Sequence, residues 1–462
     1  QQDDGVTPTV VMWFRRDLRL ADLPALHAAA ADGRRVVPLF VVDPAFASAG
    51  VGRRAFMRAA LMALDASMER ALVYRHGRPE DVVPAFAAEV GASAVYVTQE
   101  HTPYGRRRDA LVGSRLSVDG RRLVGVGSHY AVNPGSVSKA DGTPYGVFTP
   151  FCKQWRAHGW SAPAGIPEVD WYGAPAIHCE GPPPEIADEL IPAAAREFHD
   201  ESSAWARWES WLPEAARYHE TRDLMALDGT SRLSAALRWG VVHPRQLLAD
   251  LDERPDRTRG HEVLGNELGW REFYADVLFH KPHTAWSNLN PRMDAMPVDT
   301  DEDARRRFAA WTAGMTGYPV IDAAMRQLRA TGWMHNRARM LVASFLVKDL
   351  HLPWQWGARH FMQHLCDGDL ASNSHGWQWT AGTGTDAAPF FRVFNPITQG
   401  LRFDADGEYV RRWVPELAGR SGGSAHQPGG SLLDGYPDPI VDHAREREES
   451  LARYKMVTSA RG

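Results

Sequence analysis

Short apolar runs alternate with stretches of helical spacing in the first quarter of the chain. The runs VVMWF (residues 10–14), VVPLFVV (36–42) and SAVYVTQE (93–100) have the length of buried strands. Between the second and third runs, RRAFMRAALMALDASMERAL (53–72) repeats apolar residues every three or four positions, as an amphipathic helix does. Because strands that alternate with helices form parallel sheets, we predict a Rossmann-like parallel α/β domain over residues 9–130.

The pattern changes twice beyond this domain. Residues 131–204 are rich in proline and glycine, as in CEGPPPEI (179–186), and predict a long interdomain linker without a sustained helix or strand. Residues 205–462 show helical spacing again, in segments such as YPVIDAAMRQLRATG (318–332), and predict a helical domain. The low-complexity stretch SGGSAHQPGGS (421–431) predicts a surface loop.

The composition describes a globular chain and argues against several classes of protein. Its 462 residues are 44% hydrophobic, which is enough for two or three domains with cores. No apolar run is long enough to cross a bilayer and no secretory leader opens the chain, so we expect a cytoplasmic protein. Three cysteines without a CxxC pair fit a reducing compartment. The net charge of -5 argues against coating nucleic acid by bulk charge but leaves room for a local basic surface.

The common motifs for phosphate and metal binding are missing. No GxxxxGK[ST] loop occurs and no GxGxxG follows the first strand, so a standard ATP or NAD cradle is not supported. His360 and His364 are four residues apart but lack the HExxH context, and we predict no metal site. The hydroxyls and arginine of TSRLS (230–234) offer an anion cradle, although the same residues also suit a helix cap.

Several longer strings stand in one order along the chain. They are FRRDLRLAD (14–22), TSRLS (230–234), NELGWREFY (266–274), TGYPVIDAAMRQLRATGWMHNRARM (316–340) and DGDLASNSHGWQW followed by GTGTDAAPFFRVFNP (367–396). With these strings the chain resembles the photolyase/cryptochrome family over nearly its whole length, and most closely its class I cyclobutane pyrimidine dimer photolyases. The resemblance implies an α/β antenna domain, a linker and a helical FAD-binding domain. It also implies light-dependent repair of pyrimidine dimers in DNA by electron transfer from reduced FAD.

The resemblance places a flavin site in the helical domain. The residues that would hold FAD are Tyr218, Thr230, Ser231, Arg232, Leu233, Ser234, Arg271, Asn336, Arg339, Asp367, Asp369 and Asn373. Arg339 would pair with Asp367, and Asn373 would face the flavin N5 with a neutral amide. Plant cryptochromes have aspartate at the matching position, so Asn373 favours repair, although its Gly/Ser-rich surroundings also allow a turn-forming asparagine.

The same resemblance implies a lesion pocket next to the flavin. Its catalytic residues would be Glu267, Trp270, Asn336, Met340 and Trp379. Glu267 would hydrogen-bond the polar edges of the bases, and the two indoles would stack on the flipped dimer. The family's (6-4) photolyases carry histidine at the positions of Asn336 and Met340, so repair of (6-4) lesions is disfavoured. Leu264 stands where the best-known bacterial enzyme has a tryptophan.

The expected partner is UV-damaged DNA that contains a pyrimidine dimer, bound by a monomer. The residues that would contact its phosphates are Arg222, Lys281, Arg337 and Arg402, with solvated surface charge as the alternative. Three tryptophans match the family's electron-transfer chain from the flavin to the surface, and they are Trp311, Trp354 and Trp377. Helix packing would also explain these three indoles.

A second chromophore is expected in the α/β domain. Folate-binding members of the family have Asn-Glu where this chain has Tyr104 and Gly105, whereas deazaflavin-binding members have a string close to PYGR (103–106). We therefore expect 8-hydroxy-5-deazaflavin as the antenna, with methenyltetrahydrofolate as the alternative. The residues expected around it are Phe40, Asp43, Arg53 and Glu100. Ordinary turn chemistry at TPYG would explain the same residues.

Three other functions compete with dimer repair. A cryptochrome would signal through a partner protein, but we expect no extended signalling tail here, and Asn373 favours repair. A flavin-binding protein without activity would not need Glu267, Trp270, Asn336 and Trp379 together. A light-independent nucleotide-binding protein would leave the helical half of the chain unexplained.

Overall fold

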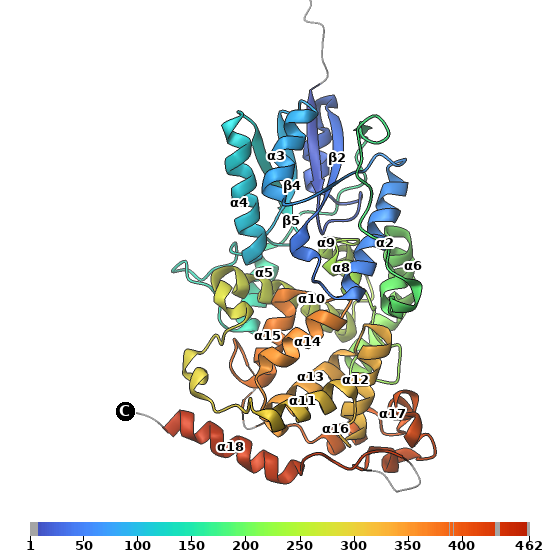
Figure 1. The fold of residues 1–462 in the computed structure, drawn as a ribbon, viewed down its shortest axis with the longest axis vertical. Helices are drawn as coiled ribbons and strands as arrows, with labels where there is room; N and C mark the ends of the chain where they lie inside the picture. The colour runs from blue at the N-terminus through green and yellow to red at the C-terminus, as the bar shows by residue number, and fades with distance from the viewer. Residues whose placement is uncertain (1–7, 388, 391, 430–434, 460–462) are drawn as a thin grey trace, which may run out of the picture.

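The chain folds into an α/β region and a helical region that lie end to end along the long axis (Figure 1). The computed structural model describes residues 8–387, 389–390, 392–429 and 435–459. The blue α/β region stands at one end of the molecule, and the orange and red helices of the second half form the other end. This two-part architecture is the one that the sequence pattern predicts.

The α/β region is built on a parallel sheet with the strand order β3-β2-β1-β4-β5. The strands are β1 (Thr9–Phe14), β2 (Arg35–Val42), β3 (Val73–His76), β4 (Ala94–Gln99), β5 (Arg122–Ser128) and β6 (Asp170–Trp171), which pairs with β2. The register of the central pair runs from Thr9 opposite Arg35 to Phe14 opposite Phe40. The predicted Rossmann-like parallel sheet is confirmed.

Helices cover both faces of this sheet. They are α1 (Pro24–Ala30), α2 (Val51–Ser67), α3 (Pro79–Glu89) and α4 (Pro103–Val118). Met12 of β1 belongs to the core that includes residues of α1 and α2, whereas its neighbour Trp13 belongs to the core that includes residues of α3 and α4. Because the central strands β1 and β2 are buried on both faces, their sequences show continuous apolar runs instead of alternation.

The linker contains more structure than its proline and glycine content predicts. The prediction of no sustained helix in residues 131–204 is wrong, because α5 (Phe148–His158) lies within them. Pro150 sits in the first turn of α5, where a missing N–H breaks no helical hydrogen bond. At the other end of the linker, α6 (Glu201–Trp211) already begins before the expected boundary.

The remaining helices form the second region. They are α7 (Tyr218–Thr221), α8 (Ser234–Arg238), α9 (Pro244–Asp252), α10 (Arg259–His280), α11 (Glu302–Ala313), α12 (Pro319–Thr331), α13 (Asn336–Ser344), α14 (Trp354–His364), α15 (Leu370–Ala381), α16 (Pro396–Phe403), α17 (Glu408–Trp413) and α18 (His443–Ser459). The long helix α10 packs against α5, α7 and α15, so it joins the linker to the second half. No helix in the described part of the chain is long and apolar enough to cross a bilayer.

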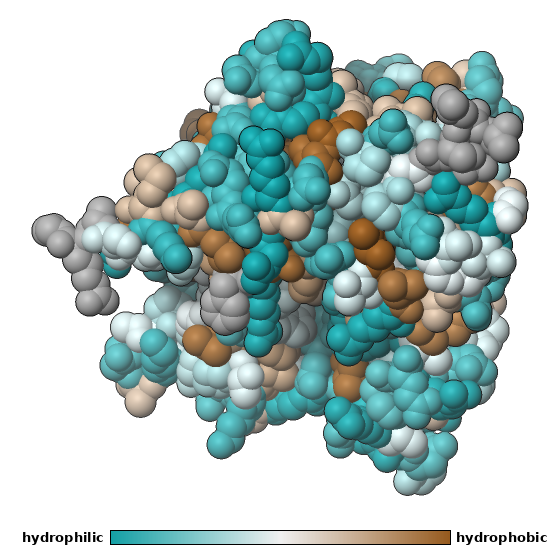
Figure 2. Space-filling view, turned by 90° about the horizontal axis from the view of Figure 1, so that it is seen from below, coloured by the Kyte–Doolittle hydropathy of each residue, from teal (hydrophilic) through white to brown (hydrophobic). Residues whose placement is uncertain are grey.

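The surface of the helical end is mostly hydrophilic, with hydrophobic side chains in small separate groups (Figure 2). Scattered apolar side chains of this kind are normal on a folded domain. The stretch 421–431 is only partly a surface loop, since Ala425 and His426 are buried and the His426 ring packs on Gly400 of α16. The prediction is therefore wrong for these two residues, and residues 430 and 431 lie outside the described ones.

Candidate active site

A cavity of about 600 Å³ opens in the helical region between α10, α13 and α15. The predicted flavin, lesion and DNA residues that line it are Tyr218, Arg222, Ser231, Ser234, Glu267, Trp270, Arg271, Asn336, Arg337, Arg339, Met340, Asp367, Asp369, Asn373, Trp377 and Trp379. Residues from four separate stretches of the chain thus line one cavity. Leu264, the residue that departs from the family pattern, lines the same cavity.

Several predicted residues lie outside the lining of this cavity. They are Thr230, Arg232, Leu233, Lys281, Trp311, Trp354 and Arg402. In the TSRLS string, Ser231 and Ser234 reach the cavity, whereas Arg232 pairs with Glu197 at 2.7 Å and lies over the ring of Trp333. The string therefore contributes its two serines to the cavity and uses its arginine as a structural contact.

Asp367 is the most fully bonded acid of the cavity. The Arg339 guanidinium donates to both of its carboxylate oxygens, at 3.2 and 2.7 Å, and Ser234 Oγ donates at 2.6 Å. Two parallel N–H bonds to one carboxylate fix both side chains in a plane. Asp367 precedes α15 and Arg339 lies on α13, so this pair ties two walls of the cavity together.

Asp369 begins α15 and connects it to the α/β region. Its Oδ1 accepts the Ser372 N–H at 3.0 Å as a helix cap, and its Oδ2 lies 3.4 Å from Arg16 and 3.8 Å from Arg238. Burial opposes ionisation of Asp369, but Arg238 and Arg16 hold its pKa below the ordinary value. Arg16, in the loop after β1, thereby places a positive charge next to Asp369 in the lining of the helical-region cavity.

The Asn373 amide is oriented by the neighbouring helix. Its Nδ2 donates to the Ala358 carbonyl of α14 at 3.0 Å, which directs the amide NH₂ away from the cavity. Gly376, one turn further along α15, also lines the cavity, and a Cβ there would meet no atom within 4 Å. This part of α15 thus presents a flat, neutral surface to a ligand.

Helix α10 supplies the opposite wall. Glu267, Trp270, Arg271 and Tyr274 lie at helical spacing and all line the cavity. Burial raises the pKa of the Glu267 carboxyl, and Arg222 offsets part of that rise through a hydrogen bond of 2.6 Å. Sequence periodicity alone would have found this face, including Tyr274, which the resemblance did not single out.

The basic residues expected on DNA divide between three places. Arg222 lines the cavity and pairs with Glu267, as described above. Arg337 pairs with Asp223 at 3.0 Å and lies over the ring of Phe403, which Arg402 also faces at 5.0 Å. Lys281 is exposed at the end of α10, away from the cavity lining. Arg337 and Arg402 therefore form one positive rim.

The three tryptophans that are expected to transfer electrons are all buried. Trp377 lines the cavity, and its ring centroid lies 6.2 Å from that of Trp311. Trp311 is fully buried and donates its Nε1–H to the Val342 carbonyl, so its own side chain does not reach the surface, and its role in electron transfer stays a prediction. It packs beneath Phe308, the next aromatic of α11, which shields it. Trp354 is 4% exposed and donates to Asn288 at 2.9 Å.

The polar groups of the cavity suit FAD. Trp377 Nε1 and Arg238 Nη1 are buried without a hydrogen-bond partner in the described part of the chain. Unpaired buried donors are costly unless a ligand or water accepts from them. Hydroxyls, an Arg-carboxylate pair and aromatic rings match the phosphates, ribityl chain and ring of a flavin nucleotide. Among the described residues no group of three or more His, Cys, Asp or Glu could hold a metal ion.

A second cavity of about 580 Å³ lies at the C-terminal edge of the sheet. Phe40, Asp43 and Glu100 line it as expected, but Arg53 does not, and its neighbour Arg54 does. The side chain of Arg53 is buried beside this cavity, where it lies over the ring of Phe46, a residue of the cavity wall. Burial lowers the pKa of Arg53 to about 10, with Arg238 adding to the effect.

Glu100 explains the glycine at the start of α4. Arg16 holds the Glu100 carboxylate with two hydrogen bonds, at 2.9 and 2.7 Å. Burial opposes the charge of Glu100, but Arg16 and His129 hold its pKa well below the ordinary value. A Cβ at Gly105 would fall 1.8 Å from Glu100 Cγ, so no larger residue fits there. The side chain of Glu100 thus fills the space beside Gly105.

One ion pair belongs to the walls of both cavities. Arg238 and Asp369 line the cavity of the helical region and also that of the α/β region. Their side chains lie 3.8 Å apart, and Arg16 approaches the same carboxylate. Neither Arg16 nor Arg238 was singled out from the sequence, although Arg238 is a single charge among apolar and small residues in SAALRWG (234–240).

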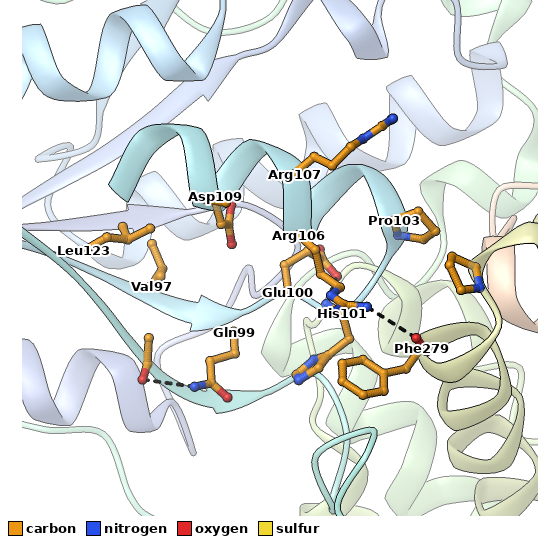
Figure 3. Close-up of a pocket in the computed structure, with 13 residues that line it drawn as sticks. Val97, Gln99, Glu100, His101, Pro103, Arg106, Arg107, Asp109, Leu123 and Phe279 are labelled. Atoms are coloured by element: carbon orange, nitrogen blue, oxygen red, sulfur yellow. Dashed lines mark hydrogen bonds between the residues drawn. The ribbon is translucent and has the colours of Figure 1, made fainter. Parts of the chain in front are cut away.

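A third hollow of about 900 Å³ lies along α4 and β5, beside the end of α10 (Figure 3). Phe279 and His101 pack side by side in its lining, with ring centroids 5.9 Å apart, and Arg106 donates to the Phe279 carbonyl at 3.3 Å. Of the predicted site residues, only Glu100 reaches this hollow.

Two family models match the chain. The model described as DNA photolyase matches residues 10–169, and the model described as FAD binding domain of DNA photolyase matches residues 263–456. Fold, cavities and matches together define a two-domain protein whose helical half is a flavin-binding domain. Its relatives make the assignment specific, and the chain belongs to the DNA photolyase family.

The chain matches relatives over their full length. A deoxyribodipyrimidine photo-lyase from Streptomyces griseus is 41% identical over 456 residues, which cover 95% of this chain and 97% of the relative. The structure of a class III photolyase from Agrobacterium tumefaciens is 34% identical with a TM-score of 0.88 and covers 100% of both chains. A Synechocystis cryptochrome structure is 28% identical with a TM-score of 0.86 and covers 97% of this chain and 99% of its own.

Proposed function

We propose that the protein repairs cyclobutane pyrimidine dimers in DNA by light-driven electron transfer from reduced FAD. One observation carries this proposal. The cavity that holds Asp367 and Asn373 at its flavin side also holds Glu267, Trp270 and Trp379, so a flipped dimer would lie directly against the cofactor. A receptor that signals only through a partner protein has no need for a second set of aromatic and acidic groups in this place.

The chain's own residues would hold the cofactor and keep it dry. Tyr218, Ser231 and Ser234 would bind its phosphates and ribityl chain, and the Asp367–Arg339 pair would fix its ring edge. When bound, FAD supplies the electron that opens the cyclobutane ring under light and takes it back afterwards. Asn373 would offer a neutral oxygen toward the ring, because its NH₂ is held by Ala358.

The lesion side of the cavity would bind the flipped dimer by complementary shape and by a few polar contacts. The indoles of Trp270 and Trp379 would stack on the two bases, and Met340 and Asn336 would close the sides. Glu267 would accept hydrogen bonds from the N–H edges of the pyrimidines. These groups bind and orient the dimer, and they transfer no proton in a required step.

DNA would be bound through its phosphates at the rim. Arg337 and Arg402, which flank Phe403, are the best-placed cations, and Arg222 and Lys281 would extend the contact to either side. A flipped base needs a basic rim around a dry pocket, because the backbone stays outside while the base enters. We propose that a monomer acts in this way in the cytoplasm.

The second cavity would hold an antenna chromophore. Trp13, Phe40 and Phe46 provide aromatic walls, and Asp43 bonded to Tyr104 provides a polar end. Glu100 is locked to Arg16 and occupies the space next to Gly105, where folate-binding relatives would place their own glutamate. We favour 8-hydroxy-5-deazaflavin over methenyltetrahydrofolate for this reason.

The deciding experiment uses a short single-stranded DNA with one thymine dimer. Purified protein with reduced FAD is incubated with it under blue light and in darkness, and the products are separated by chromatography. Restored thymines only in the illuminated sample are the expected result. Bound, reduced FAD without repair would overturn the proposal and would favour a cryptochrome-type light receptor.

A further inference from the structure

Phe148 of the linker helix stacks face to face on Trp270. The two ring centroids are 3.8 Å apart and the ring planes differ by 8°. Trp270 lines the cavity, whereas Phe148 lies behind it and is 9% exposed. Phe148 thus covers the indole face that the cavity does not use. We propose that Phe148 is a positioning residue that holds Trp270 flat against an incoming dimer, an inference that rests on the proposed function.

Gly269, which precedes Trp270, faces the linker helix. A Cβ at Gly269 would lie 3.6 Å from the Phe148 ring and 3.4 Å from Cys152 Sγ, which are ordinary van der Waals distances, so α5 packs against α10 at this point. On its other edges Trp270 meets Phe273 and Tyr274, with ring centroids 5.8 and 5.4 Å away. The indole is held on three sides, and only Phe148 lies parallel to it.

Phe148 is itself anchored by the segment that follows α15. Its backbone N–H donates to Asp386 Oδ2 at 3.1 Å, and Thr385 Oγ1 bonds to the Gly146 carbonyl. The helix start has no side-chain cap of its own, so Asp386 takes that role for α5. Asp386 adopts a left-handed backbone with φ of 47°, which brings the carboxylate to this helix start.

This anchor connects the two tryptophans of the lesion pocket. The segment with Thr385 and Asp386 continues from α15, which carries Trp379. The same segment fixes Phe148, and Phe148 supports Trp270. The linker, which the sequence pattern predicted to be a mere connector, therefore sets the spacing of the two stacking faces. A dimer entering between them extends an existing stack of Phe148 and Trp270 by one layer.

Core packing alone is the competing explanation, and the chain offers a matched control for it. Phe151 lies one turn further along α5, is 2% exposed and packs on Phe273 at 5.1 Å. No ring contact joins Phe151 to Trp270 among the described residues. Phe148→Leu and Phe151→Leu remove the same atoms from the same helix, so they should lower the melting temperature by similar amounts. Only the first removes the parallel ring.

The test measures Kd for dimer-containing and undamaged DNA of one sequence, together with FAD content. We expect Phe148→Leu to lower the preference for the dimer about three- to tenfold and to raise KM, with repair at saturating DNA within about twofold of the parent. Phe151→Leu should leave the preference unchanged, and Phe148→Tyr, which keeps the ring, should restore it. FAD content should be equal in all variants.

Two outcomes would overturn the inference. Equal loss of dimer preference in Phe148→Leu and Phe151→Leu would show general packing, and an unchanged preference in Phe148→Leu would show that the ring does not position Trp270. Should Phe148→Leu fail to fold, Asp386→Asn weakens the anchor without touching a ring and should lower the preference about twofold. A parent that does not prefer the dimer at all would instead refute the proposed function.

Discussion

Arg222 donates a hydrogen bond of 2.6 Å to the Glu267 carboxylate at the mouth of the cavity. The pair forms without DNA. Glu267, which would hydrogen-bond the bases of the dimer, therefore already has Arg222 as a charged partner before DNA binds. Glu267→Gln should lower affinity for dimer DNA about tenfold, since the loss of a charged hydrogen-bond acceptor costs about 1–3 kcal/mol. Undamaged DNA should bind slightly better, because Arg222 loses its counter-charge.

The control for this variant is Glu262→Gln, an exposed acid near the start of the same helix. It removes the same charge from α10 without reaching the cavity. If Glu267→Gln and Glu262→Gln bind dimer DNA with equal affinity in titrations at the same salt concentration, Glu267 does not contact the dimer.

Asp367→Asn should release FAD. The substitution leaves Arg339 facing an amide and removes the two-point bond that joins α13 to the start of α15. We expect FAD affinity to fall at least about tenfold, measured by flavin fluorescence after dilution. Asp404→Asn, a buried acid that accepts from Tyr409 and Val410, should lower stability but keep FAD bound. Retained FAD in Asp367→Asn would contradict the assignment.

Arg402→Gln should reduce the salt dependence of DNA binding. Arg402 is exposed, faces Phe403, and has no ion pair among the described residues, so its charge is free for a phosphate. The slope of log K against log salt should shrink by about 1, with little effect on dimer preference. Arg107→Gln, on the exposed side of α4, is the matched control and should leave the slope unchanged. An unaltered slope in Arg402→Gln would remove this residue from the DNA surface.

His335→Asn should make the protein less sensitive to acid. His335 caps α13 by accepting the Arg337 N–H at its Nδ1, and burial lowers its pKa to about 4, although Asp223 favours the charged form. A lowered pKa means that the unfolded chain binds the proton more readily. The stabilising contribution is therefore complete above about pH 6.5 and is lost as the pH falls toward 4.

Asparagine keeps the cap without titrating. Between pH 7 and pH 5 the parent should lose about 2 kcal/mol more unfolding free energy than His335→Asn, as urea titrations at both pH values would show. Parallel pH profiles for the two proteins would mean that His335 is not a source of acid sensitivity.

Trp377→Phe should slow photoreduction of oxidised FAD at least about tenfold, because phenylalanine does not give up an electron as indole does. Trp311→Phe should slow it as well, since its ring lies 6.2 Å from Trp377. Both variants should repair dimers normally once FAD has been reduced chemically in the dark. Unchanged photoreduction in Trp377→Phe would rule out this route from the cavity wall.

The local sequence pattern was sufficient to predict the parallel sheet, because one physical requirement dominates the sequence of its central strands. A central strand that is covered on both faces needs successive apolar residues, and Met12 and Trp13 on opposite faces of β1 meet that requirement. The local pattern did not predict α5, because a high proline content usually indicates the absence of a helix. Pro150 lies in the first turn of α5, where a helix tolerates proline.

The cavity needed more than local pattern. Spacing along α10 identifies one wall, but nothing in the neighbourhood of Arg16 shows that it will meet Asp369, more than 350 residues away. Arg53 and Trp311 illustrate the same limit. Both residue types suit the role expected of them, but the depth at which each side chain is buried is decided by packing against distant elements.

The wall that Arg238 and Asp369 share is one side-chain layer thick. Excitation energy passes between chromophores through space and needs no open passage, whereas solvent and small reactants do. A wall of paired charged side chains can therefore keep solvent and small reactants from passing between the cavities and still allow energy transfer between chromophores. Any substitution in that wall therefore alters both cavities at once.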